Sequence, residues 1–76
     1  MKIFNAKDFG KAVKITRKKQ KLTQIELAAA SGTGIRFIGD LEQGKPSCQL
    51  DKSLMVSRML GIKLEALLPP SIEEQD

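Results

Sequence analysis

The chain has 76 residues and a net charge of +4, enough for one small domain with a modest core, and its 41% hydrophobic and 29% charged residues are typical of a soluble protein. No apolar run approaches the roughly 18 residues that a membrane span requires, and the lysines at positions 2 and 7 interrupt any signal-peptide core, so we expect a cytoplasmic protein. One cysteine and no histidine exclude an internal disulfide and a zinc site and argue against catalysis, and we expect no enzyme activity, cofactor or metal.

The first predicted element is a helix that begins just after Asn5 and frays over residues 19–21. Asn5 is a suitable N-cap, and Asp8 stands where a side chain closes a capping box. Phe4 is placed to pack on Phe9 across this helix start. An apolar stripe at helical spacing gives the helix a core-facing side: Phe9, Ala12, Val13 and Thr16.

Most of the positive charge lies in this first third of the chain. Residues 1–21 hold eight basic side chains and one acidic side chain, whereas the remaining 55 residues hold five basic and eight acidic ones. Such a segment suits attraction to the phosphates of nucleic acid, because lysine and arginine displace the counterions that surround a polyanion. A lysine-rich helix is also typical of an ordinary solvated surface, so the charge alone does not decide between these interpretations.

The second predicted helix follows Thr23 and ends at Gly32. Thr23 is a good N-cap, and Glu26 three residues later completes a capping box. Leu22 before the cap and Leu27 inside the helix are placed to form a hydrophobic staple. Three consecutive alanines favour the helical conformation, and the glycine at its end suits a left-handed cap.

The third predicted helix runs from Ile35 to about Gln43. Gly34 is an acceptable N-cap, Gly44 supplies a second glycine stop, and Pro46 disfavours continuation of the helix. Two short helices joined by a turn of about three residues are the signature of a helix-turn-helix, a motif that binds DNA with its second helix. An ordinary helical hairpin inside a small bundle is the alternative.

This third helix has one apolar face and one exposed face. At about 100° per residue, Ile38 and Leu41 share the inner face, with Glu42 at its edge. The outer face carries Ile35, Arg36, Gly39, Asp40 and Gln43. In a helix-turn-helix this outer face, and above all its first residues, enters the major groove.

After a loop over residues 45–49, a fourth helix is predicted from about Leu50 to Leu60, and Gly61 ends it. The segment that follows is ambiguous, because its alternation predicts a strand whereas three of its leucines also fit a short helix. A lone strand is not stable in water, so the strand interpretation requires pairing with the same strand of a second copy. The residues of this dimer contact would be Ile62, Leu64, Ala66 and Leu68.

Several runs of sequence carry a resemblance to a known family. They are Thr-Gln-x-x-Leu-Ala at 23–28, Arg-Phe-Ile-Gly-Asp-Leu-Glu-Gln-Gly-Lys-Pro at 36–46 and Leu-Asp at 50–51, together with Gly10, Arg17, Gly32 and Leu60-Gly61. From Phe9 through Leu68 the chain resembles the phage-repressor-like (Cro/C1, or XRE) helix-turn-helix family, and the second and third runs resemble its HipB-like antitoxin branch. The resemblance implies an all-α fold: a compact four- to five-helix lambda-repressor-like bundle, with a short C-terminal strand that pairs across a dimer.

We therefore expect residues 1–70 to form one helix-turn-helix DNA-binding domain and residues 71–76 to form a disordered acidic tail. The resemblance also implies roles for single residues. DNA bases are contacted from Ile35, Arg36, Gly39 and Asp40. DNA phosphates are bound by Thr23, Gln24, Gln43, Gly44, Lys45 and Ser47. A structural ion pair between Arg17 and Glu42 ties the first helix to the end of the third.

Among the base-contacting positions, Arg36 is the first choice for specificity, since a guanidinium donates to both O6 and N7 of guanine. Ile35 suits a thymine methyl group and Asp40 suits cytosine N4, but pairing with a nearby basic side chain explains Asp40 equally well. Ile35 and Gly39 depart from the polar residues usual in the family, which indicates few direct base contacts and a larger part for DNA shape. Phe37 lies between the two faces and suits packing better than DNA contact.

The function implied is that of a homodimeric repressor of a palindromic double-stranded DNA operator, with no membrane partner. In the HipB-like branch such a repressor is the antitoxin of a toxin–antitoxin operon: it autoregulates its promoter and binds a HipA-like serine/threonine kinase toxin. Two alternatives stay open. One is a phage-type or restriction–modification control repressor without a toxin partner, and the other is a protein-interaction module that does not bind DNA.

Overall fold

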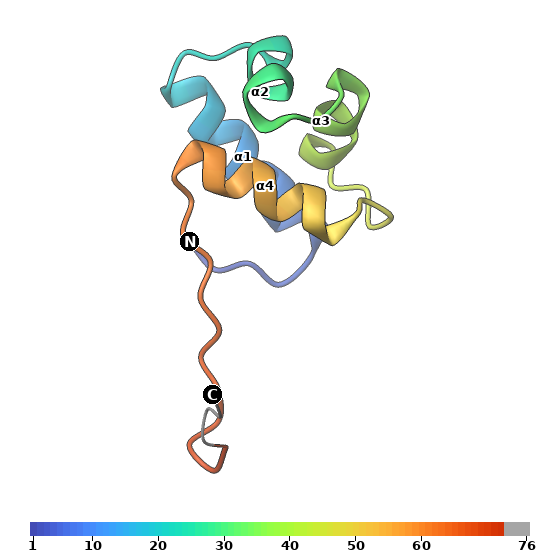
Figure 1. Cartoon of the computed structure of the whole chain (residues 1–76). Coiled ribbons are helices and arrows are strands. Elements are labelled where there is room, and N and C mark those ends of the chain that lie inside the picture. The colour runs from blue at the N-terminus through green and yellow to red at the C-terminus, as the bar shows by residue number, and fades with distance from the viewer. Residues whose placement is uncertain (73–76) are drawn as a thin grey trace.

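The computed structural model describes residues 1–72, which form four helices (Figure 1). They are α1 (Ala6–Lys19), α2 (Gln24–Ser31), α3 (Ile35–Glu42) and α4 (Leu50–Leu60). In Figure 1 α2 and α3 lie above α1 and α4. α2 and α3 pack against each other, α3 also packs on α1, and α2 also packs on α4. The described residues contain no strand, and the predicted all-α bundle is confirmed with four helices. None of these helices is long and apolar enough to cross a membrane.

The core takes residues from every helix. Val13 of α1, Leu27 of α2, Ile38 of α3 and Val56 of α4 are each 0% exposed. Around them lie the buried Ala28, Leu41 and Leu60 and the partly buried Phe9, Leu22, Phe37, Cys48 and Ile62. The inner faces that the sequence predicts for α1 and α3 therefore face the core, as their apolar spacing requires.

The start of α2 is the capping box that the sequence predicts. Thr23 Oγ1 accepts a hydrogen bond from Glu26 N at 3.1 Å, and Glu26 Oε1 accepts one from Thr23 N at 2.8 Å. The hydrogen bond from the Thr23 backbone lowers the pKa of Glu26, and the hydrogen bond with the Thr23 side chain lowers it further. The charged form of Glu26 is thus favoured at the N-terminal end of a helix, where the dipole also favours an anion.

The start of α1 departs in part from the prediction. Asn5 caps the helix as expected, since its Oδ1 accepts from Asp8 N at 2.9 Å. The Asp8 carboxylate, however, accepts at 2.9 Å from the backbone amide of Phe4 instead of from that of Asn5. This bond fixes the Phe4 backbone while the Phe4 side chain stays 81% exposed, and the predicted packing of Phe4 on Phe9 is therefore wrong.

All four helices end in one motif, in which a residue with positive φ lets two backbone amides bond back to the last turn. Three of these residues are glycines, with φ of 71°, 80° and 79°: Gly32, Gly44 and Gly61. After α1 the residue is Lys21, with φ 59°. Lys21 N donates to Lys18 O at 3.0 Å, and the next amide donates to Arg17 O at 3.1 Å. α1 thus ends in an ordered turn, and the predicted fraying of residues 19–21 is wrong.

α1 and α3 approach each other closely because two contact points have no side chain. A Cβ atom on Gly10 would lie 2.2 Å from Leu41 O of α3, closer than any real contact. Gly44, just after α3, has φ +80°, and a Cβ atom there would lie 2.7 Å from Lys7 Cα. These two glycines let the C-terminal end of α3 rest directly on the backbone of α1.

Residues 62–69 leave the bundle as an extended segment, and residues 69–72 form a turn in which Ile72 N donates to Pro69 O at 2.9 Å (Figure 1). Its large apolar side chains beyond Ile62 are exposed: Leu64 to 48%, Leu67 to 87%, Leu68 to 51% and Ile72 to 56%. In the single chain this segment contains neither a helix nor a strand, so the helical alternative for residues 62–68 is not adopted. The strand alternative needs a second chain and stays a prediction. Of the acidic tail predicted over residues 71–76, residues 73–76 lie outside the described residues.

We predict that Lys21→Gly stabilises the domain by about 1 kcal/mol, because an L side chain at positive φ costs about 1–2 kcal/mol and the freedom of glycine in the unfolded chain cancels part of the gain. The melting temperature should rise by about 4–8 °C. Gly61→Ala is the matched control: its φ is +79° and no atom lies within 4 Å of the added Cβ, so only backbone strain acts and the melting temperature should fall. A lower melting temperature for Lys21→Gly would contradict this account of the end of α1.

Candidate nucleic-acid interface

α2 and α3 form a helix-turn-helix whose turn consists of residues 32–34. Gly32 turns the chain with φ +71°. Ser31 Oγ donates to Leu27 O at 2.7 Å and lies 2.9 Å from Thr33 Oγ1. Because side-chain bonds reinforce the backbone turn, α3 leaves α2 in a defined direction.

The outer face of α3 is open to solvent. Ile38 and Leu41 on its inner face are 0% and 4% exposed, whereas Ile35 is 49% exposed and Arg36 is exposed as well. Gly39 also faces open space, since no atom lies within 4 Å of the place where a Cβ would stand. The first turn of α3 is therefore accessible to a ligand that approaches from outside the bundle.

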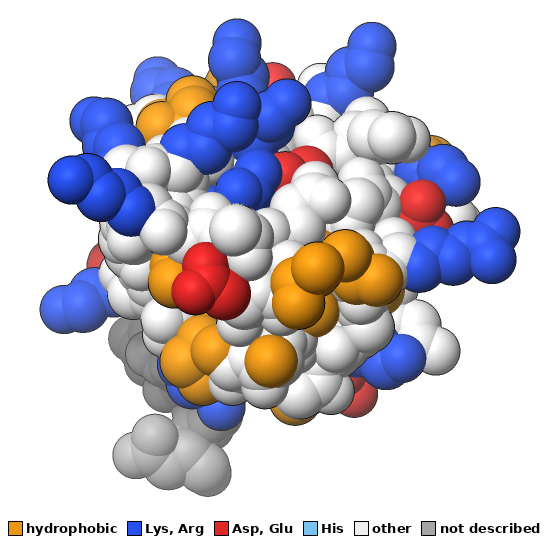
Figure 2. Space-filling view, turned by 90° about the horizontal axis from the view of Figure 1, so that it is seen from above, with side chains coloured by type: hydrophobic (Ala, Val, Ile, Leu, Met, Phe, Trp, Pro, Cys, Tyr) orange, Lys and Arg blue, Asp and Glu red, His pale blue; other side chains and the backbone are white. Residues whose placement is uncertain are grey.

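Figure 2 looks down onto α2 and α3. Lys and Arg side chains stand around the rim of this face, most densely along one edge, while its middle consists mainly of uncharged and apolar atoms with a few Asp or Glu side chains among them. Ile25 of α2 and Ile35 of α3 are large apolar side chains at the surface, 66% and 49% exposed. A basic rim around a neutral centre matches a DNA groove, whose uncharged base edges lie between two phosphate backbones.

Asp40 and Lys45, both predicted to contact DNA, contact each other. Lys45 Nζ lies 3.1 Å from Asp40 Oδ1, and the two side chains are 51% and 34% exposed. The intramolecular pairing that the sequence left open for Asp40 is therefore present in the free chain. An ion pair this exposed contributes about 0–1 kcal/mol, so either partner can be drawn away at little cost.

Arg17 of α1 binds the end of α3 and the segment before α2 at the same time. Its Nε and Nη2 donate to the two carboxylate oxygens of Glu42 at 2.6 and 3.0 Å, and its Nη1 donates to Leu22 O at 2.7 Å. Gln24 Nε2 also donates to Glu42 Oε1, at 3.0 Å. The Arg17 and Glu42 side chains are only 9% and 3% exposed. A buried ion pair with two further hydrogen bonds thus joins α1, α2 and α3.

Both members of this pair are charged at neutral pH. Burial by itself would raise the pKa of Glu42, but the hydrogen bonds from Arg17 and Gln24 and the charges of Arg17 and Lys14 outweigh it, so this pKa lies below its ordinary value of 4.5. The hydrogen bond to Glu42 likewise raises the pKa of Arg17 against the effect of burial. No buried side-chain nitrogen or oxygen in the described part of the chain lacks a partner, so the pair carries no uncompensated polar group.

The same hydrogen bonds affect the start of α2, where Thr23 and Gln24 are the predicted phosphate ligands. One N–H of the Gln24 amide is bonded to Glu42, which orients this side chain and leaves its second N–H and the free backbone amides of the first turn for an anion. Thr23 Oγ1 accepts from Glu26 N, and its own proton takes no part in that bond. The start of α2 therefore combines oriented donors with a favourable dipole.

The α3–α4 loop holds the other predicted phosphate ligands. The exposed ones are Gln43, Lys45 and Ser47. Gly44 is half-buried against Lys7 of α1, and Lys14 lies close enough to Glu42 to lower its pKa. Lys7 and Lys14 are two helical turns apart, so they share one face of α1, beside the end of α3. In the sequence these two lysines are only part of a basic segment, and because Lys11 and Lys18 have the same seven-residue spacing, no local signal distinguishes them.

Phe37 of α3 and Cys48 of the loop after it are partly buried and pack against the core. Phe37 packs against the core, as predicted, and Lys52 Nζ lies 5.8 Å from the centre of its ring. Burial raises the pKa of the half-buried Cys48, and the charge of Asp40 raises it further, whereas the charge of Lys45 lowers it by less. Cys48 is therefore a neutral thiol at pH 7. The described residues contain no group of three or more His, Cys, Asp or Glu side chains placed to hold a metal ion.

A four-helix bundle with an exposed second motif helix beside basic side chains defines the class of helix-turn-helix DNA-binding domains. A family model described as helix-turn-helix matches residues 13–67. A Sinorhizobium fredii (strain NBRC 101917 / NGR234) protein named as an uncharacterized HTH-type transcriptional regulator, y4mF, is 50% identical over 62 residues, which cover 82% of each chain. The chain therefore belongs to the helix-turn-helix family of the phage-repressor (XRE) type.

We predict that Arg17→Ala lowers the free energy of unfolding by about 3–5 kcal/mol, because it leaves the buried Glu42 carboxylate without its partner. DNA binding should weaken with it, since the end of α3 loses its anchor. The double variant Arg17→Met and Glu42→Leu removes both charges together and should cost much less. Urea melts and a gel shift measure both effects, and an unchanged midpoint for Arg17→Ala would refute the structural role of the pair.

Acid should weaken the network of Arg17, Glu42 and Gln24, because it protonates Glu42. The pKa of Glu42 is lower in the folded chain than in the unfolded one, so its contribution is complete above about pH 4.5 and is lost as the pH falls through the lowered value. We predict that the melting temperature falls below this pH and that the fall is smaller for Glu42→Gln, whose amide does not titrate. Parallel pH profiles for the two proteins would show that Glu42 does not contribute.

Proposed function

We propose that this protein is a transcriptional repressor that binds a palindromic DNA operator as a homodimer. The observation that carries the proposal is the open first turn of α3, with Ile35 and Arg36 at the surface of a face rimmed by basic side chains. The name of the Sinorhizobium relative, an HTH-type transcriptional regulator, supports a role in transcription. Two copies would place their α3 helices in successive major-groove segments, about 34 Å apart.

Arg36 is the principal base-contacting residue in this proposal. It lies at the second position of α3, is exposed, and takes part in none of the ion pairs among the described residues, so its guanidinium is free to donate to guanine O6 and N7. Ile35 beside it offers an apolar contact to a thymine methyl group. Gly39, one turn further along, has no side chain to bond a base, and its place on the open face lets the backbone come close to the DNA.

Asp40 takes part as a base contact through an exchange of partners. In the free chain Lys45 holds it at 3.1 Å. The DNA backbone competes for Lys45, because its closely spaced phosphates form a denser array of negative charge than the single Asp40 carboxylate. Once Lys45 has moved to the phosphate, the Asp40 carboxylate is free to accept a hydrogen bond from cytosine N4.

The proposed phosphate contacts form two groups. The first is the start of α2, with Thr23 and Gln24. The second is the α3–α4 loop, with Gln43, Gly44, Lys45 and Ser47, together with Lys7 and Lys14 of α1 beside the end of α3. These contacts position the domain on the duplex without selecting a sequence.

We further propose that the repressor is the HipB-like antitoxin of a toxin–antitoxin operon, which represses its own promoter and binds a HipA-like kinase toxin. The support is the run of residues 36–46 followed by Leu50 and Asp51, which resembles that branch of the family. A kinase-like reading frame directly beside the gene, and a stable complex of the two purified proteins, are the expected results. A neighbouring methyltransferase gene would instead support a restriction–modification controller, without changing the DNA-binding role.

The decisive experiment is a gel shift against the protein's own promoter and against random DNA over a salt series. We predict that Arg36→Ala costs about 1–3 kcal/mol on the promoter and little on random DNA, whereas Lys45→Ala weakens both and reduces the salt slope by about one. Arg58→Ala, an exposed arginine of α4, is the matched control and should leave both affinities unchanged. Equal wild-type affinity for promoter and random DNA would refute a sequence-specific repressor.

A further inference from the structure

Five lysines form one row along α1 and the turn that follows it. They are spaced by four, three, four and three residues: Lys7, Lys11, Lys14, Lys18 and Lys21. At about 100° per residue, the first four lie within about 60° of one another around the helix axis. All five are exposed, and none of them takes part in an ion pair among the described residues. We call this surface the lysine stripe.

The lysine stripe lies on the flank of α1 that borders α3. Arg17, which bonds Glu42 at the end of α3, is about 60° from Lys14 around the axis of α1. The charge of Lys14 reaches Glu42 and helps to lower its pKa. Lys7, at the other end of the stripe, has its backbone against Gly44 in the turn after α3. The stripe therefore runs beside the end of α3.

The stripe also connects the two groups of proposed phosphate contacts. Its first lysine adjoins the α3–α4 loop at Gly44, and its last, Lys21, stands two residues before Thr23 at the start of α2. From Lys7 to Lys18 the helix advances roughly 16 Å. Consecutive phosphates of one DNA strand are about 3.4 Å apart along the duplex axis, so the stripe is long enough to follow several of them. Figure 2 shows basic side chains gathered along one edge of the face that α2 and α3 present.

A row of lysines without anions destabilises the free helix. Like charges three or four residues apart on a helix repel each other, and Lys7 also stands in the first turn, where the helix dipole disfavours a cation. The acidic residue of α1, Asp8, lies about 100° from Lys7 around the axis and accepts a hydrogen bond from Phe4 N. Negative charge supplied from outside the chain would relieve this repulsion.

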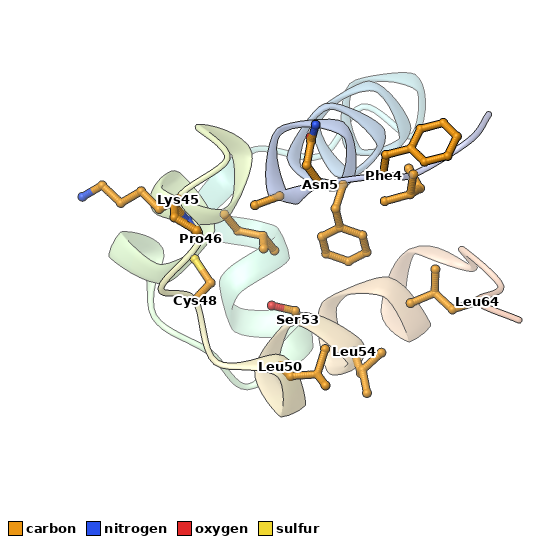
Figure 3. Close-up of a pocket in the computed structure, with 13 residues that line it drawn as sticks. Phe4, Asn5, Lys45, Pro46, Cys48, Leu50, Ser53, Leu54 and Leu64 are labelled. Atoms are coloured by element: carbon orange, nitrogen blue, oxygen red, sulfur yellow. The ribbon is translucent and has the colours of Figure 1, made fainter. Parts of the chain in front are cut away.

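The covering of apolar surface does not account for the stripe. Lysine stems often lie along apolar surface while the ammonium group stays in water. An apolar groove of about 410 Å³ opens between the start of α1, the α3–α4 loop and α4 (Figure 3). Among the described residues, the α1 side chains that line it are Ala6 and Phe9, and no lysine of α1 does so. The stripe therefore presents its charge to solvent, away from this groove.

We propose that the lysine stripe binds the backbone of one DNA strand as a continuous track between the two groups of phosphate contacts. Lys11, Lys18 and Lys21 thereby join the phosphate ligands, and α1 becomes a third DNA-binding element beside α2 and α3. Phosphate contacts carry no sequence information, so the stripe strengthens binding to the promoter and to random DNA alike. This inference rests on the proposed placement of α3 in the major groove, because that placement brings the flank of α1 toward the backbone.

A salt series on DNA binding tests the stripe. The stripe variant combines Lys11→Gln, Lys18→Gln and Lys21→Gln, and it keeps Lys7 and Lys14 because these two adjoin the end of α3. The slope of log affinity against log salt should lose about 2.7 of its magnitude, and affinity near 0.15 M salt should fall by about a hundredfold for promoter and random DNA.

The matched control removes three positive charges from exposed positions outside the stripe: Lys19→Gln, Arg58→Gln and Lys63→Gln. Lys19 is the sharpest of these, since it lies on α1 about 100° from Lys18. The control should leave the slope nearly unchanged. An unchanged slope for the stripe variant would overturn the proposal, and if that variant instead lost affinity for vesicles of anionic phospholipid, the stripe would be a membrane-binding surface.

Lys11→Gln alone separates a binding role from a structural one. It removes repulsion from both neighbours in the stripe, so the melting temperature should rise by a few degrees at low salt, while affinity for DNA falls. A residue that only supports the fold would change stability and affinity in the same direction. A lower melting temperature together with weaker binding would therefore overturn the proposal.

Interference by phosphate ethylation tests whether the track is continuous. The interfering phosphates should form one unbroken run on one strand of each half-site, and the middle of this run should stop interfering in the stripe variant. Two separate groups with a gap between them would refute the track.

The failure of this inference and that of the repressor proposal are distinguishable. If the stripe variant and the wild type bind promoter and random DNA with the same slopes while both select the promoter, the stripe is wrong and the repressor proposal stands. If the wild type binds promoter and random DNA equally well, sequence-specific repression is wrong, and the slope on random DNA still tests the stripe by itself.

Discussion

The position of the DNA-facing helix depends on the buried ion pair between Arg17 and Glu42. α3 has only eight residues, too few for a stable isolated helix, so packing must decide where it lies. Glu42 is its last residue, and the two-pronged bond from Arg17 fixes that end in direction as well as in distance. The same carboxylate accepts from Gln24, and Arg17 also binds Leu22 O, so the angle between α2 and α3 is coupled to α1. Apolar side chains of equal volume would fill this space but would not impose that geometry.

The helix that anchors α3 also supplies positive charge beside it. α1 lies unusually close to the end of α3 because Gly10 and Gly44 present bare backbone at the contacts. A larger residue at either position would push the helices apart, and Lys7 and Lys14 would move away from the edge of α3. In the proposed DNA complex, close packing and phosphate attraction would therefore be two results of one arrangement, and a substitution that widens the helix contact is expected to weaken both.

Local signals predicted most of the fold, because caps, glycine stops and apolar spacing act within a few residues. Lys21 escaped prediction because it takes a left-handed conformation for which glycine is the usual signal. Contacts between distant residues were harder to predict: 25 positions separate Arg17 from Glu42, and only a family resemblance suggested their pairing. The pairing of Asp40 with Lys45 stayed open because it depends on the turn after α3, whose backbone bond from Lys45 N to Asp40 O returns the chain toward the helix.

The side chains on the outer face of α3 decide how much a second copy of the chain would add to selectivity between DNA sequences. Ile35 contributes only apolar contact, Gly39 has no side chain, and Asp40 is paired in the free chain, so one α3 helix offers few polar groups to distinguish bases. A single domain with so few contacts would hold its site mainly through phosphates, which carry no sequence information. In the proposed dimer, the fixed distance between two α3 helices adds a geometric requirement on spacing and on DNA shape. Selectivity would then depend as much on the rigidity of the dimer contact as on Arg36, and the residues that join the two copies would be part of the proposed DNA-binding mechanism.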